Sequence, residues 1–299
     1  MKRNIVTMSM VLIIAFLMSS CNESKKYPNI FGAVRAGDIK AIKDFVKKNP
    51  EILKEQDKES RYQGTPLFEA LIARFTTDGS KVVTEEVIET LVNLGSDVNS
   101  KNKLDETPLI VAASFGFRDT VEFLINKGAV VDTKDNMGWT PLFQAAMKGR
   151  KDVAELLVEK GANVDVRDKE GHTPLMSAAG WERKDMVSFL LEKEADVNAA
   201  NKAGKTAIYF AIQKGNLEIV KLLGEKGAAL DHKDKEGQTP LHGAAIWGKK
   251  DCADYLIARG APVNALDNGK KTPLDYSEKN PEFKEVSKLI RAHGGKSNK

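Results

Sequence analysis

The stretch from Asp135 to Asp168, DNMGWTPLFQAAMKGRKDVAELLVEKGANVDVRD, holds the repeating unit of this 299-residue chain. Its Thr-Pro-Leu at 140–142 returns at 173–175, and a threonine opens the same pattern at 206, 239 and 272, always 33 residues further on. The motif also lies one period upstream at 107–109, and again 42 residues before that, at 65–67. A fixed period of this length is typical of supersecondary units stacked in a line, each burying its apolar face on the next. The sequence therefore predicts a solenoid.

The residues inside the unit predict two helices and a turn. Pro141 suits the first turn of a helix, where its missing N–H is not needed, and Gly149 is typical of a left-handed helix end. Gly161 ends a second helix, and residues 163–171 contain the Asp and Gly of a tight turn. Apolar residues at helical spacing mark the buried faces: Leu142, Ala145 and Ala146 in the first helix, and Val153, Leu156 and Leu157 in the second.

These motifs identify a family. T-P-L-x-x-A-A followed by L-L-x-x-G-A-x-V-D/N resembles the ankyrin repeat, and Thr239-Pro240-Leu241-His242 gives the motif in full. The resemblance implies an all-α ankyrin-repeat solenoid of stacked helix-loop-helix units with short β-hairpin turns. It also implies a module that binds proteins rather than an enzyme.

The N-terminus has the layout of an export signal. Lys2 and Arg3 precede a mostly apolar run and the small Ser19-Ser20, which is typical of a secretory signal peptide over residues 1–20. Residues 17–21, Leu-Met-Ser-Ser-Cys, resemble the lipobox of bacterial lipoproteins, which implies cleavage before Cys21 and lipidation of that cysteine. The alternative is an ordinary cleaved signal with a chance cysteine. We expect an exported protein, lipid-anchored to the cell envelope of a bacterium on the periplasmic side of either membrane or at the cell surface.

The rest of the chain divides by the repeat. Residues 21–28 form the lipidated cysteine and tether, 29–60 an N-terminal capping repeat, 61–270 six internal repeats, and 271–299 a C-terminal capping repeat and tail. The first internal repeat carries nine extra residues around Arg74–Glu85. We interpret them as a longer loop with an extended second helix, or as a partner-contacting elaboration. Two further departures, Glu182 in place of a helix-ending Gly and the missing proline after Thr206, should weaken helix boundaries without altering the fold.

Several chemistries are disfavoured. Lys and Arg number 46 against 42 Asp and Glu, and this balance gives no electrostatic case for nucleic acid. AANKAGKT at 199–206 lacks the first glycine of a phosphate-binding loop, and S-x-x-K at 100–103 lacks its companion motifs. The four histidines have no metal-ligand spacing, and Cys252 falls on a core position. We expect no catalytic residues, metal or cofactor, and we expect Asp135, Asp168 and Asp234 to cap turns rather than bind calcium.

A binding face is predicted from the register. Counted from each motif threonine, positions −4, −3, −1, +7 and +8 vary in ankyrin repeats and line the concave face. All three tryptophans fall on them, and large apolar side chains on an exposed face mark an interaction surface. The alternative is that these aromatics lean on neighbouring repeats and only stabilise them. The candidate protein-binding residues are Phe115, Met137, Trp139, Met147, His172, Trp181, Ile246 and Trp247.

The function predicted is a monomeric, membrane-anchored binding module for a protein partner. A specific version of this function, by analogy, is an immunity-like or protective role. Intervening Lys148, Lys169, Lys205 and Lys214 suggest a partner with acidic patches. Two competing classes are a secreted, host-directed effector and an enzyme or ligand-binding protein with a pocket not visible in the sequence.

Overall fold

The computed structural model describes residues 26–60, 62–74 and 83–298. The predicted signal peptide, Cys21 and residues 75–82 of the insertion lie outside the described residues. The chain divides into two compact units: residues 1–112 with 119–130, and residues 113–118 with 131–299. Within the described residues, no helix is long and apolar enough to span a bilayer.

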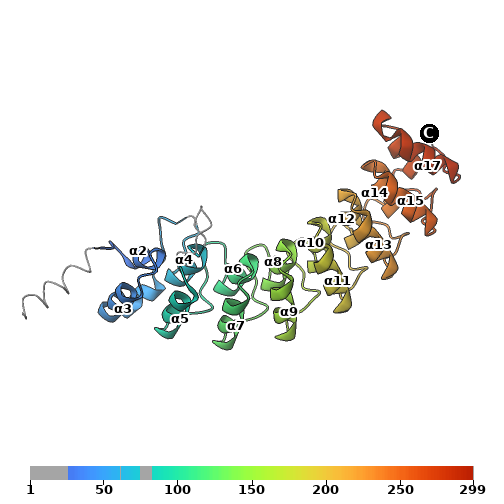
Figure 1. Cartoon of the computed structure of the whole chain (residues 1–299). Helices are drawn as coiled ribbons and strands as arrows, with labels where there is room; N and C mark the ends of the chain where they lie inside the picture. The colour runs from blue at the N-terminus through green and yellow to red at the C-terminus, as the bar shows by residue number, and fades with distance from the viewer. Residues whose placement is uncertain (1–25, 61, 75–82, 299) are drawn as a thin grey trace, which may run out of the picture. The chain divides into compact units, whose positions relative to one another are not determined.

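Unit 1 opens with the helix pair α2 (Ile30–Arg35) and α3 (Ile39–Lys48), followed by the 3-10 helix η1 (Pro50–Lys54), α4 (Pro66–Ile72) and α5 (Glu85–Asn93) (Figure 1). Asn29 and Asp38 begin the first two helices, since each side chain accepts a hydrogen bond from a backbone N–H of the first turn. The apolar residues Ala33, Val34 and Ile42 are fully buried. The helical spacing predicted for the first repeat is thereby confirmed.

The second helix after the insertion has the ordinary length. α5 has nine residues, the same number as α9 (Lys151–Glu159) in a repeat without an insertion. The expectation of an extended second helix is therefore wrong, because the extra residues lie between α4 and α5. After α5 come α6 (Pro108–Phe115) and α7 (Arg118–Asn126), and the turn that joins these two helices groups with unit 2.

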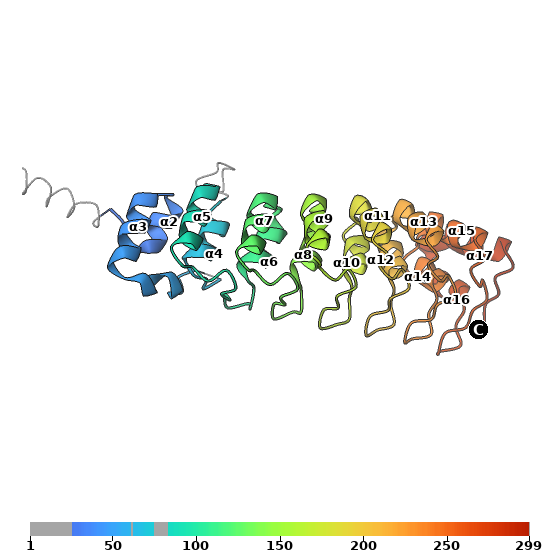
Figure 2. The same cartoon turned by 90° about the horizontal axis from the view of Figure 1, so that it is seen from below.

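Unit 2 consists of two rows of helices, which Figure 2 separates. Each first helix begins after a motif threonine, and α12 begins at Ala207 although its proline is missing, so this loss leaves the start of the helix in place. The first-helix row is α8 (Pro141–Lys148), α10 (Pro174–Gly180), α12 (Ala207–Lys214), α14 (Pro240–Ile246) and α16 (Pro273–Ser277). The second-helix row is α9, α11 (Lys184–Glu192), α13 (Leu217–Glu225), α15 (Lys250–Ala258) and α17 (Lys284–Ala292), the last preceded by the 3-10 helix η2 (Pro281–Phe283).

The core of unit 2 lies between these rows. Leu142, Ala145 and Ala146 of α8 have no exposed surface, and neither do Val153 and Leu157 of α9. The small alanines allow the first helices to approach one another closely, and the longer side chains fill the space beneath them. The predicted all-α solenoid is confirmed.

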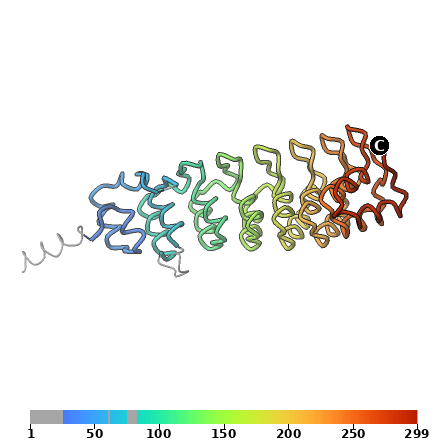
Figure 3. Tube along the Cα trace, turned by 90° about the horizontal axis from the view of Figure 1, so that it is seen from above, coloured from blue at the N-terminus to red at the C-terminus, as the bar shows by residue number. Residues whose placement is uncertain are grey.

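The turns between repeats project from one side of the helices (Figure 3). In one of them, Asp135 Oδ1 accepts hydrogen bonds from the backbone N–H groups of Met137 and Trp139 at 2.8 and 2.9 Å. Asp168 and Asp234 do the same in their own turns, so the predicted capping role is confirmed. Successive turns are also joined by backbone bonds, such as Lys169 N–H to the Met137 carbonyl at 3.0 Å.

The described residues contain no β-strand, so the β-hairpins implied by the family are present only as turns. An aspartate side chain, or an asparagine at 102 and 201, supplies the acceptor that closes each of these turns. The single backbone bond from a turn such as 135–138 to the next one is too little pairing to make a β-ladder.

Glu182 adopts a backbone conformation that its repeat neighbours leave to glycine. Its φ of 59° matches the 72° of Gly149, one period earlier. A Cβ on Gly149 would lie only 2.9 Å from Cδ of Arg183, which covers that glycine from the next repeat. The residue at the corresponding place near Glu182 is the shorter Asn216, whose amide donates to Glu182 Oε2 at 3.3 Å. The short side chain of Asn216 thus makes room for that of Glu182, but the positive φ of Glu182 still carries a steric cost.

We expect Glu182→Gly to be more stable than Glu182→Ala by about 1 kcal/mol, because only glycine adopts positive φ without a steric cost. The thermal midpoint should differ by about 2–4 °C between these variants. The matched control is Glu155, an exposed residue inside α9. At this site Glu155→Ala should be more stable than Glu155→Gly by a similar amount, because glycine is unfavourable inside a helix. The same order of stability at both sites would refute the strain assignment.

His242 connects α14 to the next repeat. Its Nδ1 accepts from the Thr239 backbone N–H at 3.1 Å, so its Nε2 carries the proton and donates to the Lys271 carbonyl at 3.1 Å. The side chain is fully buried, and burial lowers the pKa of His242 below the usual histidine value of 6.5. Protonation of Nδ1 would remove the acceptor that caps the helix.

Stability should therefore decrease as the pH falls below about 6.5, because the unfolded chain then binds a proton that folded His242 resists. Above that pH the contribution is complete. His242→Gln keeps an acceptor and a donor on a side chain that does not titrate. Thermal unfolding at pH 7.5 and 5.5 should show a smaller loss of stability for this variant than for the wild type. Equal losses would show that His242 does not contribute to the pH dependence.

Candidate functional site

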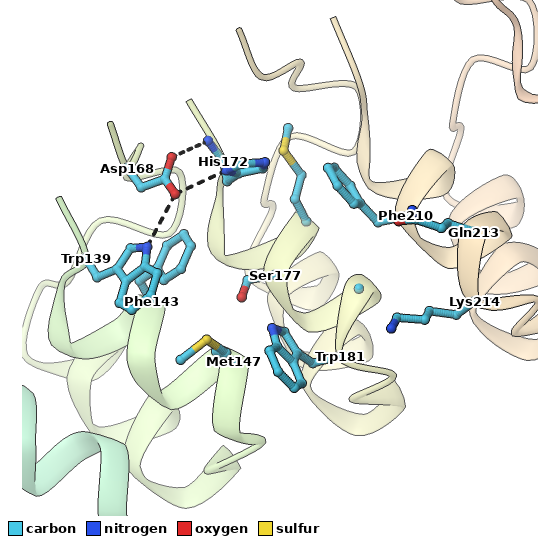
Figure 4. Close-up of a pocket in the computed structure, with 12 residues that line it drawn as sticks. Trp139, Phe143, Met147, Asp168, His172, Ser177, Trp181, Phe210, Gln213 and Lys214 are labelled. Atoms are coloured by element: carbon cyan, nitrogen blue, oxygen red, sulfur yellow. Dashed lines mark hydrogen bonds and ion pairs between the residues drawn. The ribbon is translucent and has the colours of Figure 1, made fainter. Parts of the chain in front are cut away.

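A groove of about 340 Å³ opens on the first-helix row of unit 2. Its lining comes from three consecutive repeats, through α8, α10, α12 and the turns before α8 and α10 (Figure 4). The walls are mainly aromatic and thioether side chains, with a few polar groups at the edges. The lining residues are Trp139, Phe143, Met147, Asp168, His172, Met176, Ser177, Gly180, Trp181, Phe210, Gln213 and Lys214. We call this the aromatic groove.

Trp139 forms one wall and is held there by two contacts. Its ring stacks on Phe143, with centroids 5.8 Å apart and planes 6° apart. Its indole N–H donates to Asp168 Oδ2 of the next repeat at 3.3 Å, and the side chain is half-buried. Trp139 therefore both stabilises the stack and presents a rigid aromatic surface.

Trp181 lies on the opposite side of the groove and is the most exposed of the three tryptophans, at 57%. It caps the C-terminal end of α10, and Figure 4 shows its ring across from Met147 of α8. Among the described residues no other ring stacks on it. An exposed indole next to an apolar groove is costly in water, because its apolar surface is hydrated until another molecule covers it.

Asp168 and His172 close one end of the aromatic groove. Asp168 Oδ2 pairs with His172 Nδ1 at 3.1 Å, and the His172 ring lies edge-on to Phe210 at 5.5 Å between centroids. His172 is thereby fixed by its own turn and by the next repeat.

All eight predicted binding residues belong to unit 2, but only Trp139, Met147, His172 and Trp181 line the groove. Trp247 packs edge-on against Tyr209, with centroids 4.8 Å apart, and Ile246 beside it is half-buried. Met137 is 47% exposed at a turn, and Phe115 is 36% exposed and stacks on Phe117. The contacts of Trp139 and Trp247 agree with the stabilising alternative, whereas the exposure of Trp181 agrees with an interaction surface.

Phe143, Met176 and Phe210 complete the apolar walls and were missed by the sequence reasoning. They stand three or four residues after the motif threonine, inside the helical framework, which suggested core positions. Phe143 and Met176 are indeed buried, yet they form the floor of the groove. The sequence signal that could have found them is their large apolar side chain, since the last internal repeat has His242 and Gly243 at the same two positions.

Reactive chemistry is weakly represented. Cys252 is 1% exposed, and burial raises the pKa of its thiol to about 11, which keeps it protonated and unreactive at neutral pH. Within the described residues no group of three or more His, Cys, Asp or Glu side chains is arranged to hold a metal ion.

The comparisons with known proteins agree with the repeat register. A family model described as ankyrin repeats (3 copies) matches residues 80–168, 160–234 and 226–299, which together make up most of the chain. A search of curated proteins found no match. Ankyrin repeats are in general non-enzymatic scaffolds for protein–protein interaction. The 33-residue helix–loop–helix–turn unit and the family match together show that the chain belongs to the ankyrin-repeat family.

Proposed function

We propose that the protein is a membrane-anchored interaction module that binds a protein partner at the aromatic groove. The observation that carries this proposal is the 57% exposure of Trp181 beside a groove with aromatic and methionine walls. Tryptophan is enriched at the energetic centres of protein interfaces, and methionine adapts to different apolar surfaces. A partner that covers Trp181 removes apolar surface from water without first rearranging the rigid walls at Trp139 and Phe143.

The anchor of the module is proposed from the sequence alone. The signal-like residues 1–20 and the lipobox-like residues 17–21 support acylation at Cys21. The described helices begin at Ile30, so only a short segment separates Cys21 from the first repeat. An acylated cysteine would therefore hold the repeats close to the membrane surface.

The binding site can be tested by affinity capture from the envelope fraction of the native bacterium, with residues 22–299 as bait. Trp181→Ala should reduce capture of the specific partner at least about tenfold, because truncation of an interface tryptophan commonly costs more than 1.4 kcal/mol. Trp181 is preferred to Trp139 and Trp247 because its side chain contributes less to packing.

The matched control for capture is Leu266→Ala, which removes an apolar side chain that is 43% exposed and outside the groove. It should bind as the wild type does, and circular dichroism should show both variants folded. Equal capture by Trp181→Ala and the wild type would exclude the aromatic groove as the site.

The anchor can be tested in the full-length chain with Cys21→Ser. The wild type should partition into the detergent phase, carry the mass of attached acyl chains and be processed in a globomycin-sensitive manner. The variant should lose all three properties. Release of the wild type into the medium without acylation would refute the anchor and support the secreted-effector alternative.

A further inference from the structure

The aromatic groove has an unequal distribution of charge. Of its lining residues only Asp168 and Lys214 carry a formal charge when His172 is neutral. Asp168 is bonded within the protein and Lys214 is not, so Lys214 is the charge that a partner can meet.

Both carboxylate oxygens of Asp168 are occupied by contacts within the protein. Its Oδ1 accepts from the backbone N–H groups of Glu170 and His172, both at 2.8 Å. Its Oδ2 accepts from the indole of Trp139 and pairs with His172 Nδ1, at 3.3 and 3.1 Å. The side chain is only 9% exposed. Four internal contacts leave this carboxylate little capacity to attract a cation from a partner.

Lys214 is exposed and unpaired. It lies in the last turn of α12, and Figure 4 shows its ammonium group directed toward Trp181. It forms no ion pair with any described residue, and the same holds for Lys148 in the last turn of α8. Two lysines of the second-helix row are instead paired internally: Lys151 with Glu155 at 3.6 Å and Lys184 with Glu218 at 3.0 Å.

The other predicted variable positions of unit 2 also carry mostly positive charge. In the turns and first-helix ends of unit 2, the predicted variable positions carry many more lysines than carboxylates. The lysines are Lys148, Lys169, Lys202, Lys205, Lys214, Lys235, Lys271 and Lys279, and the carboxylates are Glu170 and Glu236. The turns and first-helix ends of unit 2 are therefore cationic at these positions, although the whole chain is nearly balanced.

We propose that the aromatic groove binds a polypeptide segment in which a bulky apolar residue stands next to an aspartate or glutamate. This inference rests on the proposed function. The apolar side chain lies between Trp139 and Trp181, and the neighbouring carboxylate pairs with Lys214. The apolar walls supply affinity by burial, and the ammonium group selects the charge and orients the segment. At about 340 Å³, the groove is at the lower end of the range for ligand sites, which suits one or two side chains.

A library of random twelve-residue peptides displayed on phage provides the probe. The library is selected on the immobilised full chain, and the selected peptides are then tested for binding to the Trp181→Ala variant. Selected peptides should be enriched, relative to the starting library, in Asp or Glu next to a large apolar residue. Binding of synthetic copies should weaken as salt increases, since an exposed ion pair is screened.

A charge reversal separates the role of Lys214 from general electrostatics. Lys214→Glu should weaken the selected peptides about five- to tenfold, through loss of one exposed pair and gain of one repulsion. The control is Lys221→Glu, which makes the same change of net charge at an exposed residue of the second-helix row. It should change affinity less than about twofold.

The selected peptides test the groove as a docking site and the acidic segment as its ligand separately. Peptides that need Trp181 but show no acidic enrichment, or basic enrichment, would overturn the acidic-segment proposal and leave the groove as a docking site. Peptides indifferent to Trp181→Ala would overturn the groove itself. A dimer of the full chain that dissociates with Trp181→Ala would instead assign the groove to a second copy and also overturn the proposal.

Discussion

Burial of one helix pair against the next is the constraint on which the rest of this protein depends. A single pair of short helices has too little apolar surface of its own, so each repeat is stable only with a neighbour on its open side. The side chains that face a neighbour must be small in the first helix and larger in the second. Within unit 2 this demand leaves the turns and the ends of the first helices free to vary. The candidate site combines those positions with the framework residues Phe143, Met176 and Phe210.

The aromatic groove shows how the same residues serve the stack and the site. Asp168 closes its own turn, holds the indole of Trp139 from the preceding repeat and pairs with His172. Because these bonds are made before any partner arrives, the walls around Trp139 are already ordered. Preorganisation of this kind reduces the entropy lost on binding. Trp181 lacks such a contact, and it is the residue whose exposed surface a partner can cover.

Departures from the repeat are compensated by neighbouring residues. Glu182 occupies a left-handed position that favours glycine. Asn216 stands where three other repeats place the longer Arg150, Arg183 and Lys249, so the glutamate side chain has room. Lys214 differs in another way, because its charge has no ion-pair partner among the described residues, unlike Lys151 and Lys184 of the second-helix row. The first departure is resolved inside the fold. The unpaired ammonium group of Lys214 lies next to the apolar groove, and this is the basis for expecting an acidic partner.

The repeat period, the helix boundaries at Thr-Pro-Leu and the turn aspartates were readable from the sequence because they depend on contacts between residues close in the chain. The length of α5 was not readable in this way, since nine extra residues around Arg74–Glu85 lengthen the motif spacing from 33 to 42 residues whether they enter a helix or a loop. The grouping of Trp139, Met147, His172 and Trp181, and the recruitment of Phe143, Met176 and Phe210, were decided by the tertiary structure. These residues come from three repeats, and only the packing of one repeat on the next determines which side chains meet and which remain exposed.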